Sequence, residues 1–564
     1  MSSTLPITDP SPDLVGDLLR EQQSLSAVER FSVLHEAGNI ENEPAQARYY
    51  RDLLPASPPS PGQQFAFQVD LDKCSGCKAC VVACHTLNGL EEDESWRKVG
   101  TITIGEAETD SLPTIQHVTT ACHHCEDPGC LNGCPVKAYD KDPVTGIVRH
   151  LDDQCIGCKY CTMMCPYEVP KYSDRLGIVR KCDMCHQRLS AGEAPACVQA
   201  CPNEAIAITI VDQGMTFASD ERIASGAPLS SISKPTTQYV SSVSEKIASA
   251  VPQDAKVDHV AESHWPLAVM LVATQASVGI IIAERFWSAA LVLAGVETSI
   301  MATRISATAA LLVGGIGLNI APLHLGQPLR AWRVFLGLKT SWLSREAIIL
   351  GKYMGVLTAA VVLLWMPTFS EYVPDIIQAW TPDWAAKAAL GLSIPIGIAG
   401  LYSSAMIYIV TRRKLWRHSR TFVRFLGTSV IVGLAGVAGI AAVVGYGKSA
   451  AIMGLISVAF AVAKLVWEYR IHLGSGVSSS TDDFDRRSHR LVKSQLSELA
   501  KIRTISGAVG IFVLLLAATI APASPSLSGV AAIFAAAVFL ASELAERWLY
   551  FSSVVYDRMP GTFK

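Results

Sequence analysis

Charged residues are scarce in this chain, and cysteine is absent outside one short segment. Only 17% of the 564 residues are Asp, Glu, Lys or Arg, 50% are hydrophobic, and the mean hydropathy is +0.30. A composition this apolar excludes an ordinary soluble enzyme. The net charge of −3 lacks the basic excess typical of nucleic-acid-binding proteins. The opening residues, MSSTLPITDPSPDLVG, have neither the basic and apolar stretches of a signal peptide nor a twin-arginine pair, so we expect no leader.

The apolar residues are concentrated after Trp265, in long segments with few charges. Apolar segments of about 18 residues or more are typical of transmembrane helices. We expect eight, at 266–284, 304–323, 345–366, 386–410, 421–446, 449–469, 503–521 and 527–549. Pro522 and Pro525 separate the last two.

Lys and Arg are unevenly divided between the two sides of these spans. The connections on one side, with the C-terminal tail, hold 16 of them, and the connections on the other side hold four. The positive-inside rule assigns the richer side to the cytoplasm. Because the number of spans is even, the residues before the first span lie on that same side. We therefore expect a multi-pass protein of the cell (inner) membrane with its N-terminal part in the cytoplasm.

Composition divides the chain into four segments. They are an N-terminal helical arm with a Pro-rich linker, a cysteine domain, a flexible linker and a membrane anchor, at 1–64, 65–212, 213–263 and 264–564. In the first, Ser26-x-x-Glu29 is a capping box that predicts a short amphipathic helix. The third is polar without periodicity, as a tether is. Short strands are expected in the cysteine domain, at 65–69, 115–119, 147–150 and 205–210.

All 16 cysteines fall into four groups. The groups are Cys74-x2-Cys77-x2-Cys80-x3-Cys84, Cys122-x2-Cys125-x4-Cys130-x3-Cys134, Cys155-x2-Cys158-x2-Cys161-x3-Cys165 and Cys182-x2-Cys185-x11-Cys197-x3-Cys201. Three thiolates within seven residues can bind three corners of one cubane, and a fourth, three residues on, reaches a neighbouring cluster. Four zinc sites would also use 16 cysteines, but zinc sites favour two separated pairs. The spacing therefore predicts four 4Fe–4S clusters.

Residues 70–210 resemble the four-cluster iron–sulfur subunit of the dimethyl sulfoxide reductase superfamily. Pro135, Pro166 and Pro202, each directly after the last cysteine of a group, belong to the same ferredoxin-type pattern. The resemblance implies two ferredoxin-like modules in which groups one and four share two clusters, and groups two and three share two more. The implied ligand sets are Cys74, Cys77, Cys80, Cys201; Cys84, Cys182, Cys185, Cys197; Cys122, Cys125, Cys130, Cys165; and Cys134, Cys155, Cys158, Cys161. It also implies that the last set faces the membrane and the first faces a catalytic subunit.

The membrane half is similar to the eight-helix anchor of dimethyl sulfoxide reductase, which is usually a separate polypeptide. The matching residues are His264-Trp-Pro-Leu267, His324-Leu-Gly-Gln-Pro-Leu-Arg330, Ser341-Trp-Leu-Ser-Arg345-Glu346 and Glu543-x3-Arg547 with Tyr550. The resemblance implies that His324 and Glu346 take part in menaquinol oxidation. An imidazole and a partly desolvated carboxylate are suitable acceptors for the two protons that a quinol loses. Arg330 is expected to orient the head group or to keep Glu346 ionised.

The same residues also have a structural interpretation. It takes His324 as an interfacial histidine and Glu346 as an ordinary carboxylate at a helix N-terminus. Lys464 and Glu468, four residues apart, are expected to pair with each other or to extend toward the membrane surface. Gln275 is expected to bond to a neighbouring helix rather than to a quinone. No C-x-x-C-H motif occurs, and histidine is absent from the interiors of the spans, so we expect no haem.

Together these observations predict an α+β double ferredoxin-like domain followed by an all-α membrane domain of eight helices. The predicted function is that of a redox subunit that takes quinol from the quinone pool of the membrane lipid, oxidises it, and passes electrons through four clusters to a molybdopterin-containing catalytic subunit. That partner would be dimethyl sulfoxide reductase-like or cytoplasmic nitrate reductase-like, since the chain has no nucleotide loop or catalytic triad of its own. One alternative is the same architecture run in reverse, as the quinone-reducing subunit of a dehydrogenase. Another is a transporter or proton-translocating module with a redox-regulatory domain, which usually shows discontinuous helices or an inverted repeat.

Overall fold

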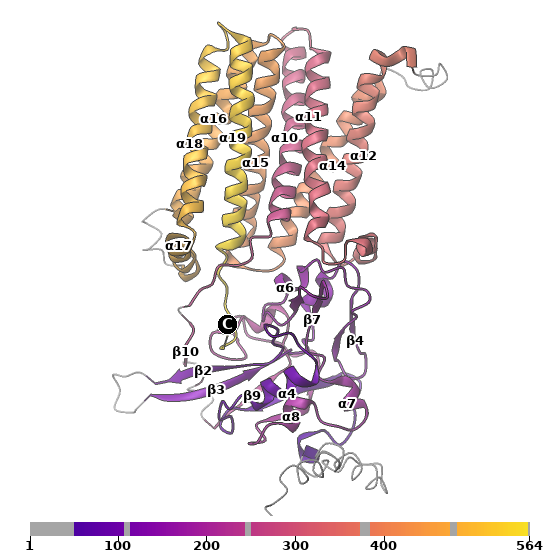
Figure 1. Ribbon diagram of the computed structural model, residues 1–564, viewed down its shortest axis with the longest axis vertical. Coiled ribbons are helices and arrows are strands. Elements are labelled where there is room, and N and C mark those ends of the chain that lie inside the picture. Colours follow the sequence, from indigo (N-terminus) through magenta and orange to yellow (C-terminus); the bar gives the residue numbers. More distant parts are fainter. Residues whose placement is uncertain are drawn as a thin grey trace, which may run out of the picture.

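The computed structural model describes residues 50–105, 113–242, 247, 250–255, 257–372, 384–473 and 482–561. The molecule is elongated, with a bundle of long helices standing on a smaller domain of short strands and helices (Figure 1). We call these parts the membrane bundle and the cysteine domain. The short helix expected around Ser26 and Glu29 lies outside the described residues.

The cysteine domain contains two small sheets and two hairpins. Its strands are β1 (Gln63–Asp70), β2 (Lys98–Ile104), β3 (Thr114–Thr120), β4 (Tyr139–Lys141), β5 (Val148–His150), β6 (Lys171–Ser173), β7 (Ile178–Arg180), β8 (Ile206–Asp212), β9 (Gln238–Val240) and β10 (Val251–Pro252). The sheets have the orders β8-β1-β9 and β10-β2-β3, and the hairpins are β4-β5 and β6-β7. In β1 the side chains of Ala66, Phe67 and Val69 are buried, and Phe65 lies opposite Ile210 in the antiparallel register. The four strands expected from sequence are thus present, with six others.

Five short helices begin within the cysteine groups, with η2 before the first group and η3 after the last. In chain order they are η2 (Arg51–Leu53), α4 (Ala79–Leu87), α5 (Gly129–Gly133), α6 (Tyr160–Met164), α7 (His186–Ser190), α8 (Ala196–Gln199) and η3 (Ser230–Ile232). Two loops repeat one conformation: the Gly-Cys-Lys at 76–78 and at 157–159 both have left-handed Gly and Lys residues. Gly76 has φ +73° and Gly157 has φ +67°, a region that glycine enters at little cost. In these two groups the backbone therefore reverses after the second cysteine and starts a helix that carries the third.

The segment 213–263 is more ordered than the flexible linker expected from sequence. Its β9 pairs in parallel with β1, and its β10 pairs with β2. The Tyr239 hydroxyl donates a hydrogen bond to the carbonyl oxygen of Thr119 at 3.2 Å. The segment thus supplies partners for sheet edges that would otherwise leave backbone groups unpaired. Strands of two or three residues are too short to show periodicity, which is why sequence reasoning missed them.

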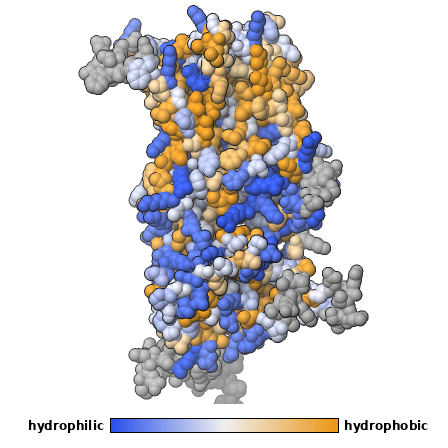
Figure 2. Space-filling model, turned by 180° about the vertical axis from the view of Figure 1, so that it is seen from behind, coloured by the Kyte–Doolittle hydropathy of each residue, from blue (hydrophilic) through white to orange (hydrophobic). Residues whose placement is uncertain are grey.

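Within the described residues, eight helices are long and apolar enough to cross a membrane, which confirms the eight expected spans. They are α10 (Trp265–Leu293), α11 (Ile300–Ile320), α12 (Trp342–Trp365), α14 (Trp384–Ile409), α15 (His418–Val443), α16 (Gly447–Glu468), α18 (Ser497–Ile520) and α19 (Pro525–Ser552). Shorter helices and turns extend or join them: η4 (Ala321–His324), η5 (Pro328–Gly337), η6 (Met366–Tyr372), η7 (Lys414–Trp416), the π turn η8 (Tyr469–Leu473) and the helix α17 (Asp483–Gln495). Figure 2 shows hydrophobic side chains over the bundle and hydrophilic ones at its lower end and over the cysteine domain.

Helix α10 lies at the centre of the bundle, in contact with α11, α14, α15 and α19. Helices α10 and α15 approach each other so closely that a side chain at Gly279 or Gly433 would overlap the backbone of the opposite helix. Small residues at such crossings allow membrane helices to pack by van der Waals contact, which is their main source of association energy in lipid. The bundle is therefore a packed support for the residues at its lower end.

The cysteine domain docks against the end of the bundle through the segment that joins α11 to α12. The backbone N–H of Gln327 donates to the Ile156 carbonyl at 3.0 Å, and that of Gly337 donates to Pro135 at 2.7 Å. The Ser341 hydroxyl donates to Gly133 at 2.7 Å. These bonds fix two cysteine loops of the domain against the membrane helices.

Candidate functional site

Two cavities in the cysteine domain are each lined by four cysteines. One is lined by Cys74, Cys77, Cys80 and Cys201, and the other by Cys122, Cys125, Cys130 and Cys165. Both combine cysteines that are distant in sequence, and both coincide with a ligand set implied by the family resemblance. All 16 cysteines are in the described part of the chain and carry free thiols.

The other eight cysteines also lie near their expected partners. Burial raises the pKa of Cys84 to about 12, with Cys197 and Cys185 among the groups that raise it further. Burial likewise raises the pKa of Cys158, and the neighbouring Cys134 and Cys155 thiols add to the effect. The remaining members, Cys182 and Cys161, have thiols of the same sets among their electrostatic neighbours. Members of each of these two implied sets are therefore among one another's electrostatic neighbours.

Buried cations among these thiols test whether the sites suit an anionic cluster. Arg97 is 2% exposed, and its Nε and Nη2 atoms have no hydrogen-bond partner among the described residues. Cys197, Cys80, Cys182 and Cys84 are the neighbours that raise its pKa against the effect of burial. A buried guanidinium is costly without a compensating negative charge. Thiolates bound to an iron–sulfur cluster would supply that charge, so the residues fit the group.

Lys181 is a second cation of this kind. Its ammonium group is buried, lies 3.6 Å from the Cys122 sulfur, and donates to the carbonyl oxygens of Cys182 and Val148. Sequence analysis did not identify Arg97 or Lys181. Both residues lie among the cysteine groups in sequence. Most basic residues of such a domain are expected to be exposed, so the sequence does not indicate that these two are buried.

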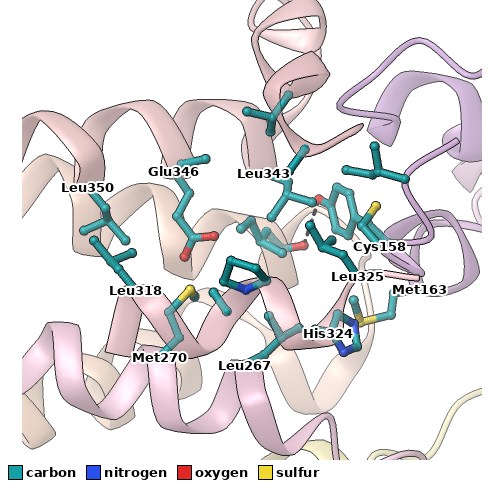
Figure 3. Close-up of a pocket in the computed structure, with 18 of the residues that line it drawn as sticks. Cys158, Met163, Leu267, Met270, Leu318, His324, Leu325, Leu343, Glu346 and Leu350 are labelled. Atoms are coloured by element: carbon teal, nitrogen blue, oxygen red, sulfur yellow. Dashed lines mark hydrogen bonds between the residues drawn. The ribbon is translucent and has the colours of Figure 1, made fainter. Parts of the chain in front are cut away.

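A third cavity lies where the cysteine domain meets the membrane bundle, and we call it the junction cavity. Its volume is about 240 Å³. The walls are mostly apolar and come from α10, α11, α12, α14 and η5, with the residues 156–163 of the cysteine domain closing one side. Figure 3 shows Leu267, Met270, Leu318, Leu343 and Leu350 around it. Pockets of this kind, apolar with a few polar groups, are typical sites for small organic ligands.

His324 and Glu346 both line the junction cavity, as Figure 3 shows. His324 ends η4 and is 9% exposed, while Glu346 lies in the first turns of α12 and is 3% exposed. Within the described residues, His324 Nε2 and Glu346 Oε1 have no hydrogen-bond partner. Unpartnered polar atoms are rare inside proteins and are expected to bond to a ligand or water. The two residues identified from sequence are therefore brought together in one cavity.

Cys158 also lines this cavity, beside Tyr160 and Met163. It belongs to the cysteine set that the family resemblance places toward the membrane. A group bound by that set would thus be next to any ligand that contacts His324 and Glu346.

Arg330 differs from the expectation. It is not among the residues that line the junction cavity, and its Nη1 atom instead donates to the carbonyl oxygens of Asp152 and Cys155, each at 3.2 Å. Carbonyl oxygens of a loop need donors from outside it, and the guanidinium supplies them. Arg330 thus joins η5 to the cysteine domain rather than contacting the cavity.

Several charged residues inside the bundle form a network. Lys464 is 3.9 Å from Glu468 but contacts Glu543 more closely, and Arg503 binds both Glu468 and Glu543 at 3.0 Å. The expected pair at 464 and 468 is therefore part of a network across α16, α18 and α19. Gln275 accepts a hydrogen bond from Arg547 at 3.0 Å, which matches the expected helix–helix role.

Comparisons with known proteins also divide the sequence into a cysteine-rich part and a membrane part. Residues 114–211 match a 4Fe-4S dicluster domain, and residues 259–553, over half of the sequence, match the DMSO reductase anchor subunit (DmsC) family. The B subunit of the anaerobic dimethyl sulfoxide reductase of Escherichia coli (strain K12) is 37% identical over 155 residues, or 27% of this protein and 75% of that subunit. The corresponding subunit of Haemophilus influenzae is 32% identical over 179 residues, 31% of this protein and 87% of its own length. The thiosulfate reductase electron transfer subunit PhsB of Salmonella typhi is 38% identical over 151 residues, 27% of this protein and 78% of its own length.

Proposed function

Because this chain belongs to the DMSO reductase anchor subunit family, with an iron–sulfur domain similar to the reductase B subunit on the same polypeptide, we propose that it oxidises quinol for a separate reductase. It is a fusion of an electron-transfer subunit with a multi-pass membrane anchor. The partner proposed is a molybdopterin-containing catalytic subunit, bound on the side of the first cysteine set. The chain itself would carry the quinol site and no other catalytic centre.

One observation carries the proposal: the junction cavity holds His324 and Glu346, with unpartnered buried atoms, beside Cys158. A quinol has an apolar ring and two hydroxyl groups. The leucine and methionine side chains of the cavity suit the ring, and the imidazole and carboxylate suit the hydroxyls. The mostly apolar wall would also keep water away from the reacting oxygens.

Oxidation of a quinol releases two protons and two electrons. His324 and Glu346 would each accept one proton, since both line the cavity that would hold the ligand. The four cysteine sets would hold four 4Fe–4S clusters, which when bound supply one-electron transfer. Cys158 lies at the cavity wall, so the set to which it belongs is the proposed first acceptor.

The test uses the whole chain, purified anaerobically with its partner. We expect iron close to 16 atoms per polypeptide, as four 4Fe–4S clusters require. The variants His324→Gln and Glu346→Gln should each slow cluster reduction by quinol about 100-fold or more, with iron content and reduction by dithionite unchanged. Lys352→Met is the matched control, because Lys352 is an exposed residue of the same helix as Glu346.

Three outcomes would contradict this proposal. Loss of iron in the His324 or Glu346 variants would make these residues structural. Unchanged reduction rates would place the quinol elsewhere. Oxidation of the clusters by quinone, with no reduction by quinol, would reverse the direction of electron flow.

We also propose that the cysteine domain faces the cytoplasm, because its side of the bundle carries most of the loop Lys and Arg residues. A cytoplasmic acceptor such as nitrate would then be favoured over an external sulfoxide. Alkaline phosphatase fused after Lys564 should be inactive. Activity of that fusion would place the domain outside the cytoplasm.

A further inference from the structure

A second histidine lies behind His324, outside the junction cavity. His264 directly precedes α10, has a left-handed backbone (φ 44°) and is 9% exposed. Its ring meets that of His324 edge to face, with ring centroids 5.0 Å apart and an interplanar angle of 83°. Phe551 covers another side of the His264 ring at 5.8 Å.

A carboxylate lies on the far side of His264. The Nδ1 atom of His264 is 3.7 Å from Oε1 of Glu262, and this nitrogen has no hydrogen-bond partner in the described part of the chain. The same Glu262 oxygen accepts a hydrogen bond from the Lys159 ammonium at 2.7 Å. The Glu262 side chain is 54% exposed. His324, His264 and Glu262 thus lead from the buried cavity to the solvent.

We propose that His264 and Glu262 form the exit path by which a proton released at the junction cavity reaches water. This inference rests on the proposed oxidation of quinol at His324. That reaction breaks two O–H bonds, passes two electrons singly to oxidised iron–sulfur clusters, and leaves two protons. One proton moves from the quinol hydroxyl to His324, then to His264, and leaves through Glu262 to the solvent.

The electrostatics of the two groups agree with this path. Burial lowers the pKa of His264 to about 4, although the Glu262 carboxylate opposes that effect. His264 is therefore neutral at pH 7, so its ring can take up one proton and release another from Nδ1 toward Glu262. Burial acts to raise the pKa of Glu262, but the charge of His264 in its protonated form and the hydrogen bond from the Lys159 ammonium outweigh that effect, so the pKa is lowered. The Glu262 carboxylate thus stays negative and stabilises the protonated ring of His264. The other charged or titratable groups that act on His264 are His324, Lys159 and Arg413.

The test compares His264→Gln and Glu262→Gln with His259→Gln. His259 is an exposed histidine of the same segment and lies outside the path. In stopped-flow measurements, His264→Gln should slow cluster reduction by quinol at least about tenfold and increase the solvent deuterium isotope effect. Imidazole in the buffer should restore part of the rate. A fluorescent hydroxyquinoline N-oxide, used as a quinol analogue, should bind with a Kd within about twofold of that for the unchanged protein, because neither residue lines the cavity.

The outcomes separate this inference from the function on which it depends. If quinol does not reduce the clusters of the unchanged protein, the proposed function fails. If it does, and His264→Gln behaves like His259→Gln, the exit path is wrong while the quinol site stands. Loss of analogue binding in the His264 variant, without rescue by imidazole, would give His264 a structural role and also overturn the path.

Discussion

The hydroxyl of Tyr160 donates a hydrogen bond to the backbone carbonyl of Ile407 at 3.1 Å, and both residues are buried. Tyr160 begins α6 of the cysteine domain, whereas Ile407 is in the last turn of α14. The carbonyls of a last turn have no partner within their own helix. One side chain of the cysteine domain therefore satisfies an end of a membrane helix.

Tyr160→Phe should destabilise the docked arrangement by about 1–3 kcal/mol, because the Ile407 carbonyl would remain buried without a donor. Thermal unfolding of the purified protein in detergent measures this. Tyr402→Phe is the control, since Tyr402 is on α14 but is 46% exposed. Equal melting temperatures for the two variants would show that the hydrogen bond contributes little.

Gly326→Ala should move the cysteine domain away from the bundle. A side chain at position 326 would overlap the carbonyl of Gly177, which is itself in a left-handed conformation that glycine favours. Overpacking of this kind costs about 1–3 kcal/mol. Gly351→Ala is the matched control, because a side chain there meets no atom within 4 Å. We expect a protease to release the cysteine domain faster from the Gly326→Ala protein than from the Gly351→Ala protein. Similar release rates for the two variants would contradict the close contact.

Glu543→Gln should be among the most destabilising substitutions in the bundle. The carboxylate of Glu543 binds Lys464 and Arg503, and all three are buried, so its neutralisation leaves these two cations to share the single carboxylate of Glu468. Breaking a buried ion pair from one side costs about 3–5 kcal/mol. Glu498→Gln, which removes the exposed pair with Lys501, should cost less than about 1 kcal/mol. A melting temperature that falls equally in both variants would argue against the network as a stabilising element.

Stability of the β4-β5 hairpin should depend on pH through Asp142. Its carboxylate accepts backbone N–H bonds from Thr145 at 2.8 Å and Val144 at 2.9 Å, and these lower its pKa. A carboxylate with a lowered pKa in the folded state contributes stability that is complete above its unfolded pKa and is lost as the pH falls through the folded value. We expect hydrogen exchange in the hairpin to accelerate below about pH 4. In Asp142→Asn this acceleration should be absent, and its persistence would assign the effect to another group.

The features that could be predicted from sequence depend on local spacing or on long apolar segments. The cysteine groups and the eight spans are of this kind, whereas the role expected of His324 and Glu346 came from the family resemblance. Binding of a cluster requires cysteines that are close together in sequence, and crossing a membrane requires a long apolar segment.

The features that could not be predicted depend on contacts between distant segments. Arg330 was expected at the quinol site because it follows His324 closely, but the direction of its side chain is set by carbonyls of a loop far away in sequence. No sequence pattern identifies Arg97 and Lys181, because their burial depends on thiols from several cysteine groups. The strand β9 exists only because β1 offers a free edge.

The C-terminal tail forms a second link between the two parts of the molecule. After α19 the backbone returns to the cysteine domain, where the Gly561 N–H donates to Asp254 at 3.0 Å and Pro560 lies against Gly100 of β2 (Figure 1). A protease site engineered between residues 240 and 250 would therefore cut the polypeptide without separating the two halves. The fragments should copurify, and removal of residues 554–564 should weaken their association without abolishing it, because the contacts of the segment between α11 and α12 remain.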